Sequence, residues 1–149
     1  MARSRVRPQL EPTTGFLIVR VAEAIDRRFQ ARLRPLRLRP RQLHVLRYVD
    51  AAGGTSQGDL ADGISVDPGN LVETLDQLEA EGLIRREVDS RDRRRRSISL
   101  TPAGRRKLRA GLRAAEQADT DVLGALERHE LASLRNAVLR AYRGAQHGS

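Results

Sequence analysis

An arginine-rich segment in the second half of the chain holds the residues with the most distinctive chemistry. Five of the six residues from Arg91 to Arg96 are arginines, and Asp92 is interleaved among them. Guanidinium groups bind phosphate bidentately, and arginine also enters a narrow, electronegative minor groove. The alternative is a loop that only increases solubility, although such a charge cluster repels itself. The residues expected to contact nucleic acid here are Arg91, Arg93, Arg94 and Arg95.

A second set of polar residues precedes this segment at helical spacing. Asn70, Glu73, Thr74 and Gln77 are three and four residues apart, so they are expected to share one face of a helix whose buried stripe is Leu71, Leu75 and Leu78. Asn and Gln pair with adenine, Glu accepts from the cytosine amino group, and Thr contacts the thymine methyl. The alternative interpretation is that any amphipathic surface helix carries such a polar face.

The elements that would position these residues follow from caps, breakers and periodicity. Ser56, with Asp59 three residues later, begins one short helix, and Asp67-Pro68 begins the next, which ends near Gly82. Residues 83–88 and 96–100 are β-prone and flank a hairpin tip over 89–95. The order of helix, turn, helix and basic hairpin predicts a winged helix-turn-helix over residues 38–101.

Longer helices flank this lobe. Residues 13 or 14 to about 34 are predicted to form the first helix, and a second helix begins at Pro40. Two more are predicted from Thr101-Pro102 to about Leu126 and from about Glu130 to Tyr142, with a frayed tail from Gly144. Residues 1–11 are expected to form a loose arm. The fold class is mainly α with a small β-hairpin wing, in one domain over residues 1–149.

The composition narrows the function classes. The formal net charge is +9, which favours an anionic partner. An arginine-rich proteome would explain why arginine replaces lysine, but it would not explain the excess of positive charge. Aromatic residues make up 3% of the chain, so the core is expected to be aliphatic and helical. The absence of cysteine excludes disulfides and thiolate metal sites, and no cofactor is expected. No apolar run is long enough for a membrane span, which predicts a cytoplasmic protein.

The ordered set of these segments resembles the MarR family of bacterial transcription regulators. The matching segments are Leu38–Leu46, Ser56–Ala61, Asp67–Val72, Leu75–Glu79, Gly82–Ile84, Asp89–Arg94 and Leu100–Gly104. The resemblance implies a homodimer held by residues 1–36 and 102–143, with one recognition helix and one wing per protomer on double-stranded DNA. Apolar stripes in the two C-terminal helices also favour a dimer. The expected function is repression at an inverted-repeat operator.

The resemblance has two departures and one further implication. Gly69 stands where many members have Ser or Thr, and it lets the backbone approach a phosphate. Glu73 stands where members often have a basic residue; because it would repel phosphate, it either reads a base or is held by a neighbouring arginine. With Ser56, these positions complete the expected DNA-contacting set. The family also implies a small aromatic or anionic effector between lobe and dimerisation helices. The candidate residues are Phe16, Arg20, His44, Arg47 and Tyr48, although the residue types favour a place in the core for Phe16 and in an interface for His44.

Three other functions are weighed against this one. A non-specific architectural DNA-binding protein would use the same charge but no base-reading face. An enzyme would need a nucleophile–base pair or a metal-ligand cluster, and the sequence provides none, so catalytic residues are not expected. An RNA-binding protein would need exposed aromatic residues for stacking, and two Tyr and two Phe are too few.

Overall fold

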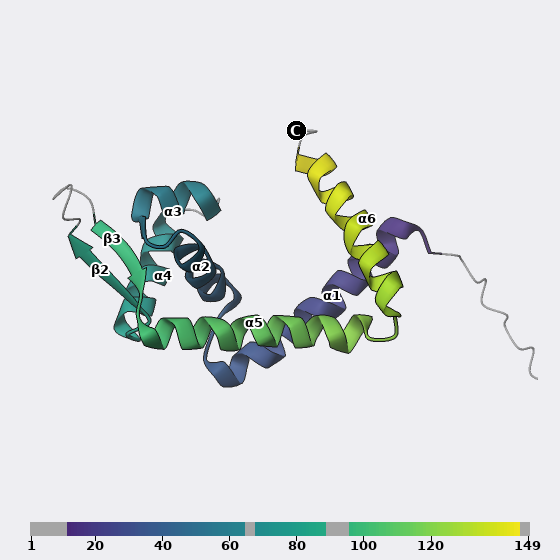
Figure 1. Cartoon of the computed structure of the whole chain (residues 1–149), viewed down its shortest axis with the longest axis horizontal. Coiled ribbons are helices and arrows are strands. Elements are labelled where there is room, and N and C mark those ends of the chain that lie inside the picture. Colours follow the sequence, from purple (N-terminus) through teal and green to yellow (C-terminus); the bar gives the residue numbers. More distant parts are fainter. Residues whose placement is uncertain (1–11, 65–67, 89–95, 147–149) are drawn as a thin grey trace, which may run out of the picture.

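The computed structural model describes residues 12–64, 68–88 and 96–146. Its elements are, in chain order, α1 Thr14–Leu33, the 3₁₀ turn η1 Arg34–Leu36, α2 Pro40–Ala51, β1 Thr55–Ser56, α3 Gln57–Ile64, α4 Pro68–Ala80, β2 Ile84–Val88, β3 Arg96–Leu100, α5 Pro102–Leu123 and α6 Arg128–Gln146. The described chain is mainly helical with one small sheet, as expected. In Figure 1, α5 joins a lobe of α2, α3, α4 and the strands at one end to α6 at the other.

The small sheet has one more strand than the expected hairpin. Its order is β1-β3-β2, and both pairings are antiparallel. In the hairpin, Ile84 pairs with Leu100 and Val88 with Arg96. The additional strand, β1, has only two residues, and its Thr55 pairs with Ile98. This sheet joins the hairpin to the start of α3, so the two halves of the lobe share one scaffold.

Helix ends follow the local signals in most places. The Thr101 hydroxyl accepts from the backbone N–H of Gly104 at 3.0 Å and so caps α5. Gly82 has φ +67° and ends α4, as the sequence predicts, because this left-handed conformation carries no Cβ penalty in glycine. Two expected bounds were wrong. Helix α5 ends at Leu123, three residues before Leu126, and α6 continues through Gly144 to Gln146.

The hydrophobic core lies within the lobe and extends to the C-terminal end of α1. It contains aliphatic side chains from every helix of the lobe, and the fully buried members include Leu33, Leu46, Leu60, Leu75, Leu78 and Ile98. Helix α1 packs along α5, and the Arg32 guanidinium forms an ion pair with Asp121 at 2.6 Å. Lys107, the only lysine of the chain, donates to the Leu36 carbonyl at 2.7 Å and holds η1 against α5.

Two helical surfaces stay outside this core. No residue of α6 is buried, although Leu131, Leu134, Val138, Leu139 and Tyr142 are large and apolar. The N-terminal half of α1 is also exposed, and Phe16 has 56% of its surface accessible, so the alternative that placed Phe16 in the core is wrong within one chain. None of the helices in the described ranges is both long and apolar enough to cross a membrane.

Candidate nucleic-acid interface

The first helix of the candidate interface is fixed by a side-chain cap. The Ser56 hydroxyl accepts from the backbone N–H of Asp59 at 3.1 Å and donates to the Asp59 carboxylate at 2.6 Å. This satisfies an N–H group that has no partner within α3. The predicted capping pair is therefore confirmed. Because Ser56 also belongs to β1, the same residue sets the direction of α3 relative to the sheet.

Helix α4 presents its buried stripe as expected but not its whole polar face. Leu71, Leu75 and Leu78 are almost completely buried. Thr74 is also buried, with 6% of its surface accessible, and its hydroxyl donates to the Asn70 carbonyl at 2.8 Å. The expectation that Thr74 lies on the exposed polar face is therefore wrong. A threonine whose hydroxyl is hydrogen-bonded within its own helix can face the core, so the polar side chain alone did not predict exposure.

The other polar residues of α4 lie on the accessible side. Gly69, Asn70 and Glu73 are exposed, and Gln77 is half-buried. The Gln77 amide donates to the Glu73 carboxylate at 3.0 Å, one helical turn away. The sequence left open whether Glu73 is held by an arginine, and in the structure its partner is this amide. The face of α4 that could contact bases is thus Asn70 and Glu73, with Gln77 supporting Glu73.

The structure holds a clasp between the hairpin and α4 that the sequence did not predict. The guanidinium of Arg86, on β2, forms ion pairs with Asp76 and with Glu79, the latter at 3.3 Å. The Arg86 backbone N–H also donates to Glu79 at 3.2 Å. The Arg86 side chain is only 12% exposed. Because β2 is an edge strand, this clasp both satisfies an outward-facing N–H and fixes the hairpin against the helix. The signal was present in the sequence as two carboxylates three residues apart.

The tip of the hairpin carries the remaining expected contacts. Arg91, Arg93, Arg94 and Arg95 lie outside the described residues, so their expected role as DNA contacts stays a prediction. The strands on either side of the tip are paired up to Val88 and Arg96. The strands β2 and β3 that carry the tip are therefore held against α4 by Arg86.

The five residues expected to line an effector cleft lie in two separate places. Phe16 and Arg20 are on the exposed N-terminal half of α1, whereas His44, Arg47 and Tyr48 are on α2. Figure 1 places these regions at opposite ends of α5. Tyr48 instead packs between helices, because its hydroxyl donates to the Asp59 carbonyl at 3.2 Å on α3. Within one chain the structure does not bring the five residues together.

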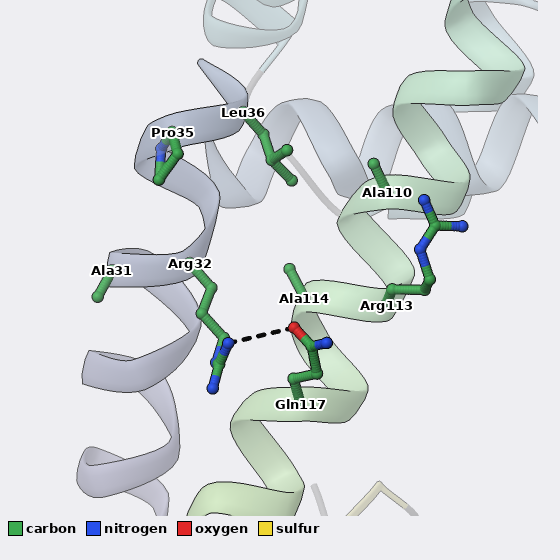
Figure 2. Close-up of a pocket in the computed structure, with 8 residues that line it drawn as sticks. All are labelled: Ala31, Arg32, Pro35, Leu36, Ala110, Arg113, Ala114 and Gln117. Carbon is green, nitrogen blue, oxygen red and sulfur yellow. Dashed lines mark hydrogen bonds between the residues drawn. The ribbon is translucent and has the colours of Figure 1, made fainter.

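Two hollows in the described surface have other linings. One, of about 330 Å³, lies between the end of α1, η1 and α5. Figure 2 shows Arg32 reaching across it to Gln117, with Ala114 and Leu36 directed into the space between the helices. The other, of about 390 Å³, lies between η1, the start of α2 and the end of α4, and three arginines line it. None of the five expected cleft residues lines either hollow.

The arrangement of a capped helix, a second helix clasped to a β-hairpin and a three-stranded sheet defines a winged helix-turn-helix protein. Comparison with known proteins gives the family. Residues 38–95 match the model of the MarR family. The transcriptional regulator HosA from Escherichia coli is 34% identical over 89 residues, which are 60% of this chain and 66% of HosA. The chain belongs to the MarR family, whose members are transcriptional regulators and not enzymes.

Solved structures agree with the assignment over most of the chain. The apo form of wild-type MarR from E. coli superposes with a TM-score of 0.76 at 25% identity, covering 89% of this chain and 98% of that one. A mutant of the same protein complexed with operator DNA gives a TM-score of 0.70 at 26% identity, covering 85% and 91%. The chain spans 60% to 66% of the length of the curated relatives it matches.

Proposed function

We propose that this chain is a DNA-binding transcriptional regulator that acts in the cytoplasm as a homodimer. The observation that carries the proposal is the pairing of an accessible polar face on α4 with a hairpin clasped to the same helix by Arg86. A major groove admits one α-helix, and the N-terminal residues of a recognition helix contact base edges. The relative solved with operator DNA shares this fold, which supports the same mode of binding.

The exposed apolar faces of α1 and α6 support the dimer. Phe16, Val19, Val138 and Tyr142 are each at least half exposed. Patches of this kind on several neighbouring elements mark protein–protein contacts, because burial of apolar area drives association. The occupant that we propose is a second copy of the chain. Each of two copies would then present one α4 and one hairpin.

A single substitution on α6 tests the dimer. Leu134→Asp places a charge in the apolar stripe and is expected to give a monomer in light-scattering measurements at micromolar concentration. The matched control is Asn136→Asp, which adds the same charge outside the stripe and should leave the dimer intact. A Leu134→Asp protein that stays dimeric would exclude this surface from the interface.

Repression by occlusion of a promoter is the regulatory mode that we propose. Two-fold symmetry predicts an inverted repeat whose half-sites are separated by about one helical turn, roughly 10 bp. Selection of binding sites from a pool of random duplexes tests specificity, symmetry and spacing together. Equal retention of all duplexes at matched salt would favour the non-specific architectural alternative.

The wing arginines are proposed to supply sequence-independent affinity. Arg93→Ala or Arg94→Ala should weaken binding to every duplex and reduce the slope of log K against log salt by about one for each phosphate interaction removed, doubled in a dimer. Arg109→Ala, which removes the same charge from an exposed position of α5, is the control. If a wing variant binds with the same slope as the Arg109 variant, the substituted arginine does not interact with phosphate.

Release by a small aromatic or anionic effector is a further part of the proposal. Phe16 and Arg20 of one chain could meet His44 and Arg47 only across two copies, so an effector cleft would be a property of the dimer. Isothermal titration of the dimer with benzoate, the simplest aromatic carboxylate, tests this, with His44→Ala as the variant. Equal heats for both proteins would remove His44 from the cleft.

A further inference from the structure

Val72 is an exposed apolar residue on α4 that none of the functions above uses. It lies in the N-terminal half of the helix and is 40% exposed. A single exposed valine is ordinary on a protein surface, so exposure alone carries no argument. The position does, because Val72 lies one helical turn before Asp76, which pairs with Arg86 of the hairpin. We propose that Val72 is a specificity-determining residue that contacts the C5-methyl group of a thymine.

The clasp shows which side of α4 Val72 occupies. Asp76 follows Val72 by four residues, so the two share one side of the helix, and Asp76 pairs with Arg86 of the hairpin. On β2, Val88 follows Arg86 by two residues and shares its face of the strand; it is 61% exposed. Since the chain reverses direction between α4 and β2, Val72 and Val88 both lie beyond the clasp, toward the N-terminal end of α4. Val72 therefore lies on the side of the recognition helix that faces the hairpin.

The chemistry of the major groove selects the partner. Base edges there carry donors and acceptors, and the thymine methyl is the apolar group among them. The sequence assigned this contact to Thr74, but Thr74 is buried and its hydroxyl is bonded to Asn70. Among the described residues of α4, Val72 is the exposed large hydrophobic side chain. It is therefore the residue that can bury a methyl group without leaving a polar atom unpaired.

The inference rests on the proposed DNA binding, and base analogues test it separately. In the duplex selected by the wild-type dimer, each thymine is replaced in turn by uracil, which removes only the methyl group. Wild type is expected to lose about fourfold in affinity at one position of each half-site, the effect of one buried methyl. Val72→Ala should bind the thymine duplex more weakly and no longer distinguish thymine from uracil at that position.

Asn70→Ala is the matched control, because it removes a side chain from the opposite flank of the same helix. It should alter site preference yet keep the thymine–uracil difference. Thermal unfolding of each variant checks that α4 stays folded. The inference is overturned if Val72→Ala keeps the full thymine–uracil difference, or if wild type selects a site but its affinity is unchanged with every uracil. If wild type selects no duplex at all, the proposed function fails and the inference falls with it.

Discussion

Replacement of Arg86 gives the most direct test of how the hairpin is held against α4. The Arg86 side chain is 12% exposed, while its partners Asp76 and Glu79 are 60% and 43% exposed. Breaking a buried pair costs about 3–5 kcal/mol because a charge is left without a partner, whereas an exposed pair contributes roughly 0.2–1 kcal/mol. In this clasp the partly exposed carboxylates can regain water. We therefore expect Arg86→Ala to lower the free energy of unfolding by about 1–2 kcal/mol.

Thermal and urea unfolding at fixed protein concentration measure this decrease. For a protein of this size, 1 kcal/mol shifts Tm by about 2–4 °C, so a loss of about 1–2 kcal/mol is expected to lower Tm by about 2–8 °C. Fixed concentration matters because the Tm of the proposed dimer would depend on protein concentration. Arg86→Met keeps most of the aliphatic stem and removes the charge, so it separates packing from the ion pairs. A Met variant as stable as wild type would show that the ion pairs contribute nothing net.

The neighbouring residue provides a matched control. Arg85 is on the same strand and pairs with Glu87 at 3.2 Å, but both side chains are about 60% exposed. Arg85→Ala should therefore change stability by less than about 0.5 kcal/mol. If Arg85→Ala and Arg86→Ala destabilise equally, the clasp has no special role and the decrease reflects β-strand propensity alone. Under that outcome, the hairpin would be held by the core residues of β2 and β3.

Four further substitutions, two of them controls, test the packing and capping of α3. Gly63→Ala places a Cβ against the ring and hydroxyl of Tyr48, so it should destabilise the protein by about 1–3 kcal/mol. Gly58→Ala, in the same helix, is the control. Its Cβ meets only the Ser56 hydroxyl at 3.9 Å, so it should be neutral or stabilising by up to about 1 kcal/mol. Equal urea midpoints for the two would contradict this packing. Ser56→Ala removes the cap on the Asp59 N–H and should cost about 1 kcal/mol in urea unfolding, while Ser56→Thr should restore most of it. An alanine variant with unchanged stability would mean that water replaces the cap.

The main elements could be predicted from the sequence because their signals are local. Thr101 marks the start of α5, and its hydroxyl accepts the hydrogen bond that a helix cap requires. Gly82 marks the end of α4 and has the positive φ that such an end requires. The strand β1 could not be predicted, since two residues have no periodicity. It forms because Thr55 and Ser56 pair with β3, which lies about 40 residues further along the chain. The stability of β1 comes from this long-range pairing, which no local sequence pattern predicts.

The candidate site was predictable in position but only partly in its residues. The polar face of α4 was located correctly for Asn70 and Glu73. Thr74 and Val72 are the reverse of what their side-chain types suggest, because the polar Thr74 is buried and the apolar Val72 is exposed. Thr74 can be buried because its hydroxyl donates a hydrogen bond to the Asn70 carbonyl. Helical spacing places both residues near the boundary between buried and exposed sides. At such a boundary the packing of neighbouring helices, and not the type of the residue, decides exposure.

The acidic residues of α4 show why the hairpin and the helix form one functional unit. Glu73, Asp76 and Glu79 would each repel a phosphate backbone, and on sequence alone they weaken the case for a recognition helix. In the structure, Arg86 pairs with two of them from the hairpin, and Gln77 holds the third. The hairpin thus offsets part of the acidic charge on α4, because one guanidinium is shared by two carboxylates. Under the proposed DNA binding, Arg86 would weaken the repulsion between α4 and a polyanionic partner, because β2 is packed against the helix.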